Sequence, residues 1–333
     1  MDEDRIDFVL TWVNGADKKW LGKKNQYSKE KVSVNTSIIR YRDWDVLKYW
    51  FRAVERYAPW VNKIFIIVDN QCPEWLETSN DKIQVVNHSE FIPEEYLPTF
   101  NSRAIELNMH RIKGLSENFV YFNDDMFLNS LTKPSDFFRK GLPVDVGSFN
   151  TVPSNGNSLS PVIFHNMEII NKKFNKKEQL HKNIFKFINL KYGKYNYRTL
   201  LLVAWPLYQG FVNTHGPIAF KKSSFKEVWD YVPEECQKTC LNKFRHSEGI
   251  NLWLIRYWQL ASGTFYPGRK KANIYYDISD EIENSFDQIL NAKNKCICLN
   301  DGSNITDFET TKEKLVTAFQ KKFPNKSIFE IDK

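Results

Sequence analysis

Residues 119–128 read FVYFNDDMFL, a run of apolar, strand-forming residues that stops at two adjacent aspartates and then becomes apolar again. Burying a carboxylate without a partner is costly, so an acidic pair between hydrophobic flanks usually faces a cation or a cleft. Asp124 and Asp125 are therefore the first candidates for chemistry. The alternative is a turn at the end of a strand, in which the aspartates bond to backbone groups. The local pattern leaves both interpretations open.

Strands and helices alternate from the N-terminus to residue 140. Runs rich in Val, Ile and Phe predict a strand at 119–123. The other predicted strands of this region span 6–11, 63–69 and 83–87. Such alternation predicts a mainly parallel sheet covered by helices, and ligands bind such sheets at the carboxyl ends of the strands. We therefore expect the loops at Asn14, Asp69 and Asp124 to converge at one edge.

Two helices are predicted between these strands. Asp43 can cap a helix whose apolar residues recur at helical spacing until Pro59 ends it. Asn101 or Ser102 can start a second helix, which stops at Gly114 because glycine favours the end of a helix.

Length and composition indicate a globular protein. The chain has 333 residues, of which 42% are hydrophobic and 15% aromatic, which is too apolar for disorder. Its apolar runs fall short of the roughly 18 to 20 residues that span a bilayer. The first residues lead into a strand without the apolar region of a signal peptide. Five cysteines are odd in number and sparse, which indicates reduced thiols and a cytoplasmic protein.

The chain is basic, with a net charge of +7, which favours an anionic ligand, membrane surface or polymer. Lysines are dense at 171–198, where Lys172, Lys173, Lys176 and Lys177 precede a run interleaved with aromatic residues. This segment is either an insertion that contacts an anionic acceptor or lipid headgroups at the inner face of the plasma membrane, or a helical hairpin with a solvated basic face. Nucleic acid is not expected, because no recognised binding signature accompanies the charge.

Two short clusters later in the chain carry groups suited to chemistry. His215 lies in the turn-like run NTHGP, and Arg245 lies in FRHSE directly before a predicted helix. A guanidinium next to the free N–H groups of a helix start is typical of an anion site. A lone histidine in a loop is more often structural, so the residues alone leave the role of His215 open.

Together these clusters resemble four blocks of the Stealth family of sugar-1-phosphate transferases. The blocks, in chain order, are IDFVLTWVNG at 6–15, a long block from Arg42-Asp43 to YFNDDMF at 121–127, THGP at 214–217 with FRHSE at 244–248, and CLND at 298–301 followed by FPNKSIFE at 323–330. All four occur in order, whereas 145–212 matches poorly.

The resemblance implies a Rossmann-like nucleotide-sugar transferase fold of the GT-A-like kind, an α/β core with a mainly parallel sheet and a helical insertion. It implies a single catalytic domain over 1–333, with 145–212 as a basic-aromatic insertion within it. The implied donor is a UDP-sugar, and the implied acceptor is an oligosaccharide or lipid-linked glycan in capsule or exopolysaccharide synthesis. The acceptor hydroxyl would attack the β-phosphorus, so that hexose-1-phosphate is transferred and UMP is released.

The resemblance also implies a role for the charged candidates. Asp125 and Asp301, with Asp124 beside them, would hold Mg²⁺ or Mn²⁺ on the diphosphate through oxygen ligands. Arg245 would bind phosphate oxygens in the transition state. His215 would be the general base, because an imidazole titrates near neutrality.

Further positions would orient the substrates. Ser102 and Glu106 lie four residues apart on one helical face, so both can point into the site, and Glu106 is the alternative base. The loop Trp12-Val13-Asn14-Gly15 would receive the nucleotide, with Gly15 permitting a close approach of the backbone.

Two other classes of protein stay open. A metal-dependent glycosyltransferase would use the same donor and the same aspartates but release UDP. An inactive saccharide-binding protein would retain the fold without turning over the donor.

Overall fold

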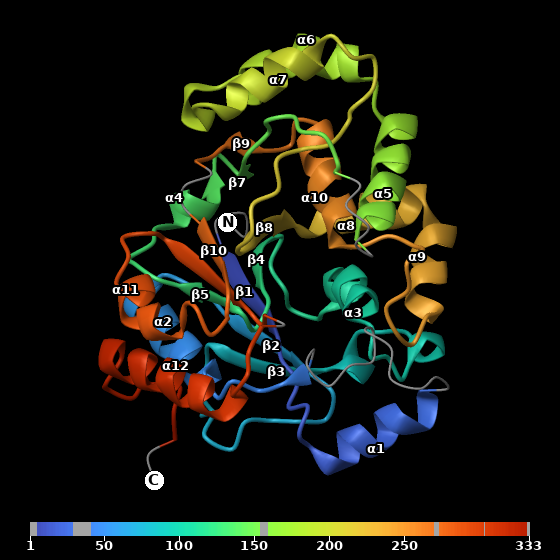
Figure 1. Cartoon of the computed structure of the whole chain (residues 1–333). Helices are drawn as coiled ribbons and strands as arrows, with labels where there is room; N and C mark the ends of the chain where they lie inside the picture. Colours follow the sequence, from blue (N-terminus) through green and yellow to red (C-terminus); the bar gives the residue numbers. More distant parts are fainter. Residues whose placement is uncertain (1–4, 29–40, 154–158, 270–272, 303, 332–333) are drawn as a thin grey trace.

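The computed structural model describes residues 5–28, 41–153, 159–269, 273–302 and 304–331 (Figure 1). Its central sheet has five strands in the order β3-β2-β1-β4-β8. The strands are β1 Ile6–Thr11, β2 Ile64–Val68, β3 Ile83–Asn87, β4 Asn118–Phe122 and β8 Ile218–Lys221. The first four run parallel, and β8 runs antiparallel to β4. The predicted α/β class with a mainly parallel sheet is confirmed.

Two smaller sheets flank the central one. One has the order β10-β11-β5 and the other the order β6-β7-β9. Their strands are β5 Met126–Leu128, β6 Phe138–Arg139, β7 Leu142–Asp145, β9 Tyr266–Pro267, β10 Asn273–Asp277 and β11 Cys296–Asn300. The backbone N–H of Leu299 donates to the carbonyl oxygen of Asp125 at 2.8 Å. The CLND motif therefore lies next to the acidic pair.

Helices surround the sheets (Figure 1). They are α1 Lys18–Tyr27, α2 Leu47–Tyr57, α3 Ser102–Asn108, α4 Pro134–Phe137, α5 Ser160–Lys173, α6 Lys176–Phe187, α7 Tyr195–Val203, α8 Lys222–Tyr231, α9 Pro233–Leu241, α10 Leu252–Ala261, α11 Phe286–Leu290 and α12 Phe308–Lys322. None of the helices described is long and apolar enough to cross a membrane.

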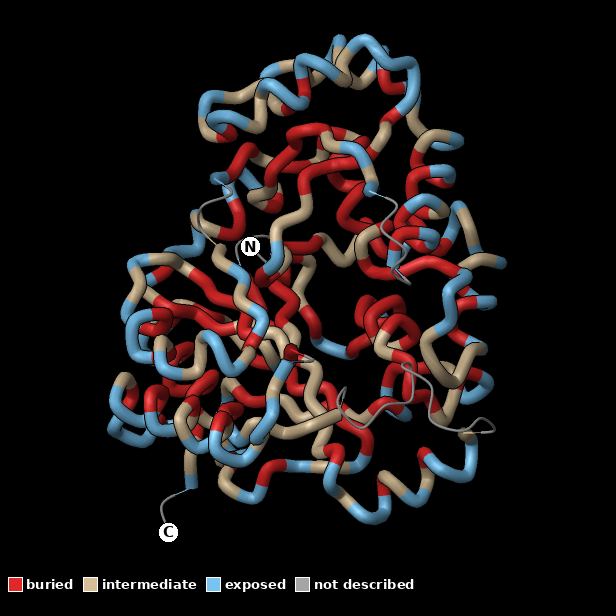
Figure 2. Tube along the Cα trace, viewed as in Figure 1, coloured by how far each residue is buried: buried red, intermediate tan, exposed pale blue. Residues whose placement is uncertain are grey.

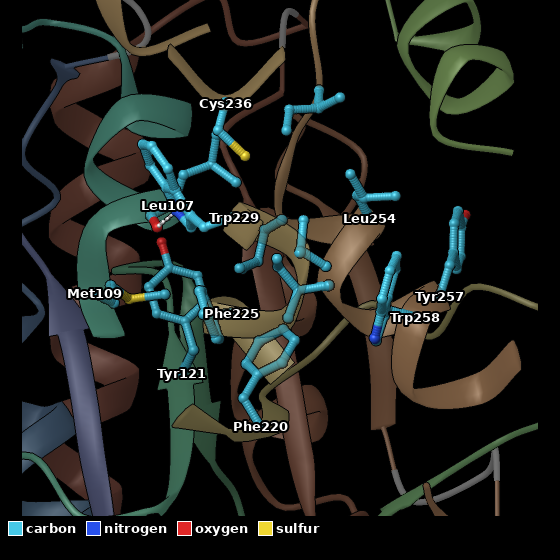
Figure 3. Close-up of a cluster of buried hydrophobic side chains, with 14 of the residues drawn as sticks. Leu107, Met109, Tyr121, Phe220, Phe225, Trp229, Cys236, Leu254, Tyr257 and Trp258 are labelled. Carbon is cyan, nitrogen blue, oxygen red and sulfur yellow. Dashed lines mark hydrogen bonds between the residues drawn. The ribbon is translucent and has the colours of Figure 1, made fainter. Parts of the chain in front are cut away.

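The strands β1, β2 and β4 of the central sheet are buried on both faces, as Figure 2 shows. Side chains alternate along a strand. Val9 therefore enters a core with α3, α8 and α10, whereas Phe8 and Leu10 enter a second core with α2 and α12. In the first core, shown in Figure 3, the indole of Trp229 donates to the Leu107 carbonyl at 2.8 Å. Burial on both faces explains why the strands read as nearly continuous apolar runs.

The two predicted helix starts had different outcomes. α3 begins at Ser102, and the Asn101 side chain accepts a hydrogen bond from the N–H of Arg103, as expected of a cap. α2 begins only after Val46, which provides no side-chain cap. The predicted cap by Asp43 is therefore wrong, and this carboxylate is available for another role.

The segment 145–212 contains α5, α6 and α7 and confirms the predicted helices. Lys176 does not lie on a solvated basic face. It is 3% exposed, and its ammonium group donates to the carbonyls of Leu202, Trp205 and Leu207 at 2.6, 2.7 and 3.3 Å. A cation at the C-terminal end of α7 satisfies carbonyls that the helix leaves unpaired.

Candidate active site

Loops that follow β1, β2 and β4 meet at the carboxyl end of the central sheet. Asn14 and Gln71 exchange two hydrogen bonds, from Asn14 N–H to Gln71 Oε1 at 2.8 Å and from Gln71 Nε2 to the Asn14 carbonyl at 3.1 Å. The hydroxyls of Thr11 and Tyr121 lie 3.1 Å apart. The loops therefore converge as the alternating pattern predicted.

Arg245 lies against the start of α3. Its Nη2 and Nε donate to the Ser102 hydroxyl at 2.5 and 3.1 Å. One turn further along α3, burial raises the pKa of Glu106, while the charge of Arg245 and a hydrogen bond with Ser102 oppose that rise. The structure therefore brings together three predicted site residues from two distant parts of the chain.

Tyr121 joins this group to the sheet, and nothing in the sequence marks it beyond its position in a strand. Its ring lies in the hydrophobic core (Figure 3), while its hydroxyl donates to Asn123 Oδ1 at 2.6 Å and Glu106 Oε1 at 3.4 Å. Burial and the neighbouring Glu106 carboxylate hold the pKa of Tyr121 well above its usual value. The phenol therefore remains a donor at neutral pH.

Asp124 is solvent-accessible in the turn after β4. Desolvation and the nearby charges of Asp125 and Asp43 raise the pKa of Asp124 to about 7. Such a rise means that the ionised carboxylate lacks compensating positive charge, although Arg245 supplies a small part of it.

Asp125 offers an oxygen to a cation. Its Oδ2 accepts a hydrogen bond from Cys298 Sγ at 3.2 Å, whereas its buried Oδ1 has no hydrogen-bond partner. Burial raises the pKa of Asp125 as well, against the hydrogen bond from Cys298. An orphaned carboxylate oxygen beside a second acidic group fits the oxygen ligands that Mg²⁺ and Mn²⁺ prefer.

Asp301 lies in a different arrangement. Its two carboxylate oxygens accept from Nη2 and Nε of Arg42 at 2.6 and 3.0 Å, a bidentate ion pair. Burial raises the pKa of Asp301, and Arg42 opposes the rise. Within the described residues, no three or more His, Cys, Asp or Glu side chains form a group that could hold a metal. Binding of a cation by Asp301 would therefore require it to leave Arg42.

Asp43 belongs to this neighbourhood, although the sequence analysis assigned it no role other than a helix cap at the start of the second family block. Burial raises its pKa, and a hydrogen bond with the Trp12 side chain opposes that rise. Trp12 and Asp43 line a cavity of about 490 Å³, together with Lys48, Trp75 and Lys312 among others. The cavity thus adjoins the loop predicted to receive the nucleotide.

In the predicted nucleotide loop, Val13 is partly buried, and Gly15 has a structural reason to be glycine. A Cβ at Gly15 would lie 1.8 Å from the carbonyl oxygen of Tyr41. The close backbone approach expected at Gly15 is therefore made by this chain itself.

His215 is exposed in the loop before β8. Its ring lies 4.4 Å from the ring of Tyr275, centre to centre. Tyr275 pairs with Cys298 in the β10–β11 register, and Cys298 in turn donates to Asp125. A chain of contacts therefore connects His215 to the acidic pair, through a tyrosine that the sequence did not single out.

Comparison with protein-family models gives two matches. Residues 4–32 match Stealth protein CR1, conserved region 1, and residues 40–144 match Stealth protein CR2, conserved region 2. The matched ranges contain the first two of the four predicted blocks and hold Trp12, Ser102 and Asp125.

Solved structures of the galactosyltransferase LgtC align with the fold. One, in complex with donor and acceptor sugar analogues, has a TM-score of 0.40 at 10% identity over 93% of this chain and 95% of its own. An active-site mutant of LgtC gives 0.39 with the same coverage and identity.

Curated relatives cover nearly the whole chain. A capsular polysaccharide phosphotransferase, WcwK of Streptococcus pneumoniae, is 46% identical over 98% of both chains. The exopolysaccharide phosphotransferase cps2G of Lactiplantibacillus plantarum is 41% identical over 98% of this chain and 96% of its own. The receptor polysaccharide phosphotransferase WefC of Streptococcus oralis is 39% identical over 98% of this chain and 100% of its own. The chain therefore belongs to the Stealth family of phosphotransferases.

Proposed function

We propose that this enzyme transfers hexose-1-phosphate from a UDP-sugar to a hydroxyl group of a glycan acceptor in capsule or exopolysaccharide synthesis. The acceptor oxygen forms a new bond to the β-phosphorus, the bond from that phosphorus to the bridging oxygen breaks, and UMP leaves. The observation that carries the proposal is full-length similarity to relatives named as polysaccharide phosphotransferases.

Arg245 is the group we assign to the transferred phosphate. Transfer of a phosphoryl group concentrates negative charge on its oxygens, and a fixed guanidinium stabilises that charge. Hydrogen bonding of both Nε and Nη2 to Ser102 holds the guanidinium at one orientation. This supports Ser102 as a residue that positions Arg245, in addition to any contact with sugar or acceptor.

Asp124 and Asp125 are the residues we assign to a divalent cation, Mg²⁺ or Mn²⁺, with Asp301 as a further ligand if it leaves Arg42. When bound, the cation would neutralise charge on the diphosphate. The unpartnered Asp125 Oδ1 and the raised pKa of Asp124 support the assignment, since both carboxylates gain from an added positive charge.

His215 is our preferred base for the acceptor hydroxyl, and Glu106 is the alternative. The exposed imidazole can reach a soluble acceptor and exchange its proton with solvent, whereas Glu106 is 8% exposed. Burial favours the protonated form of Glu106, so in the free enzyme a smaller share of this side chain is the carboxylate that can accept a proton.

The nucleotide is assigned to the loop Trp12-Val13-Asn14-Gly15 and the adjoining cavity. Trp12 and Trp75 offer aromatic surface there, and Lys48 and Lys312 offer positive charge. We further propose that 1–333 act as one catalytic domain, with 145–212 as an insertion that adapts it to its acceptor.

The identity of the released nucleotide tests the proposal. Purified enzyme is incubated with a panel of UDP-sugars and an oligosaccharide acceptor, and the products are analysed by mass. We expect UMP and an acceptor extended by hexose plus phosphate. Stoichiometric UDP with an extension of hexose alone would identify a glycosyltransferase instead, and no turnover of any donor would favour a binding protein.

A further inference from the structure

Helix α7 exposes several large apolar side chains, while Tyr195 and Leu202 pack partly into the interior. Thr199 is fully buried, and its hydroxyl bonds to the Ser148 hydroxyl at 2.9 Å and accepts from the Phe149 N–H at 3.0 Å. On the opposite side, Tyr197 is 72% exposed and Leu201 75% exposed. A surface helix normally turns its apolar side to the core, so this orientation requires an explanation.

The exposed apolar residues of α7 form one continuous stripe. Tyr197, Leu200 and Leu201 follow the spacing i, i+3 and i+4 of a single helical face, and the exposed Trp205 lies two residues beyond the end of α7. Phe185, at the end of α6, and Leu190 are 82% and 97% exposed. Exposed large apolar side chains concentrated within one short segment, here residues 185–205, are typical of an interaction site.

This surface is held firmly by the rest of the molecule. Lys176 of α6 binds the carbonyls at the end of α7, and Lys186 of α6 donates to the Gly263 carbonyl at 2.5 Å. The Tyr192 hydroxyl accepts from the Gly147 N–H at 3.0 Å. The apolar stripe therefore faces outward because polar contacts fix its other side. Figure 1 shows α6 and α7 together as the outermost layer at one end of the molecule.

Positive charge surrounds the stripe. Residues 174–207 include seven lysines and arginines but one acidic residue, Glu178. Lys177, Lys182, Lys194 and Arg198 are exposed. Apolar and aromatic side chains next to Lys and Arg are the composition of a helix that lies in the headgroup region of a bilayer with anionic lipids. A second copy of the chain fits less well, because two such surfaces would repel each other.

We propose that the α6–α7 surface, defined as Phe185, Leu190, Tyr197, Leu200, Leu201 and Trp205 with the exposed cations around them, docks onto a membrane that contains anionic lipids. The apolar side chains enter the boundary between headgroups and acyl chains, while the cations lie at the level of the lipid phosphates. Docking of this surface does not depend on which nucleotide the reaction releases, so the two proposals can fail separately.

Vesicle flotation of the full chain tests the docking. We expect binding to vesicles of phosphatidylcholine mixed with phosphatidylglycerol, little binding to phosphatidylcholine alone, and weaker binding as salt rises. The double variant Leu200→Ser/Leu201→Ser should bind about tenfold more weakly or worse. The double variant Lys194→Gln/Arg198→Gln should weaken binding by a similar factor and flatten the salt dependence.

Matched controls exclude general effects of substitution. Leu131 and Leu241 are 56% and 54% exposed outside this surface, so Leu131→Ser/Leu241→Ser should bind vesicles like the wild type. Each variant should keep the wild-type melting temperature, since the replaced side chains are exposed.

A second measurement follows insertion directly. Brominated lipids should quench tryptophan fluorescence in the wild type, and Trp205→Phe should remove most of that quenching. Equal binding by the Leu200/Leu201 variant, absence of binding to anionic vesicles, or a solution dimer that this variant dissociates would each overturn the proposal.

Discussion

Arg245 interacts electrostatically with three carboxylates of the site. Burial raises the pKa values of Glu106, Asp124 and Asp125, and the positive charge of Arg245 makes each of these rises smaller. The bonds to Ser102 leave one guanidinium edge committed and the remaining N–H groups available to a phosphate.

Replacement of Arg245 separates a catalytic from a structural role. We expect Arg245→Ala to lower kcat by about 10² or more, because loss of a phosphate-stabilising group raises the barrier by several kcal/mol. Arg245→Lys should recover part of the loss, since lysine keeps the charge but not the planar fork. Steady-state kinetics would measure this, with the exposed Arg269→Ala as control. Wild-type turnover, or a collapsed thermal melt, would contradict the role.

Asp124 makes the stability of the metal-free protein depend on pH. Its pKa is about 7 in the folded state, against about 4 in an unfolded chain. Between these values the folded state holds a proton that the unfolded state has released, so stability falls as pH rises from about 4 to about 7. Because Asp124 is exposed, solvent screening reduces the size of this fall. Asp124→Asn cannot ionise and escapes this loss.

We therefore expect metal-free Asp124→Asn to melt about 2 °C or more above the wild type near pH 8, and at the same temperature near pH 4. Calorimetry across a pH series with a chelator present would measure the difference. Asp230→Asn, at an exposed position in α8, serves as control and should show no such trend. A constant difference at every pH would show that ionisation of Asp124 is not the cause.

Residue patterns predicted part of this site. Ser102 and Glu106 share a helical face, which a spacing of four residues predicts without any structure. The Arg42–Asp301 ion pair spans 259 positions, and nothing local to either residue indicates its partner. Tyr121 was missed for another reason: its ring is a core residue, and only the hydroxyl reaches the site.

At the level of elements, strand β10 contributes a residue to the site that no sequence motif indicated. The strand carries Tyr275, which supports His215 on one side and pairs with Cys298 on the other. β10 lies outside the four family blocks, whereas the CLND block that overlaps β11 is part of the fourth. The site depends on the pairing of these two strands.

A Tyr275 series tests whether β10 positions the base. His215→Ala should lower kcat by about 10² or more. Tyr275→Ala removes the ring against which the imidazole packs and should lower kcat by about tenfold with little change in donor KM. Tyr275→Phe keeps the ring and should stay near wild type. His181→Ala, an exposed histidine of α6, is the control. Equal losses in the Phe and Ala variants of Tyr275 would exclude packing as the cause.

Across the whole molecule, alternation of strands and helices was sufficient to predict the parallel sheet, because strands buried on both faces and amphipathic helices have different periods. The outward direction of the apolar stripe on α7 could not be predicted from the sequence. A stripe at helical spacing predicts a core-facing side, whereas the structure buries Thr199 on the inner side of α7 and binds the end of the helix to Lys176.

Divalent cations should raise both the turnover and the thermal stability of the enzyme. If Asp124 and Asp125 bind the cation, exhaustive chelation should abolish turnover, and Mg²⁺ or Mn²⁺ should restore it. Binding to the folded state alone also raises the melting temperature in proportion to the logarithm of metal concentration. This rise should occur in the wild type without any substrate and should be lost in Asp125→Asn, whose amide carries no charge.

Asp301→Asn tests whether Asp301 is a further ligand. It should weaken the metal effect only if Asp301 leaves Arg42 to join the cation. Turnover that survives chelation would remove the metal from the reaction, and an unchanged melting response in Asp125→Asn would move the cation to other residues.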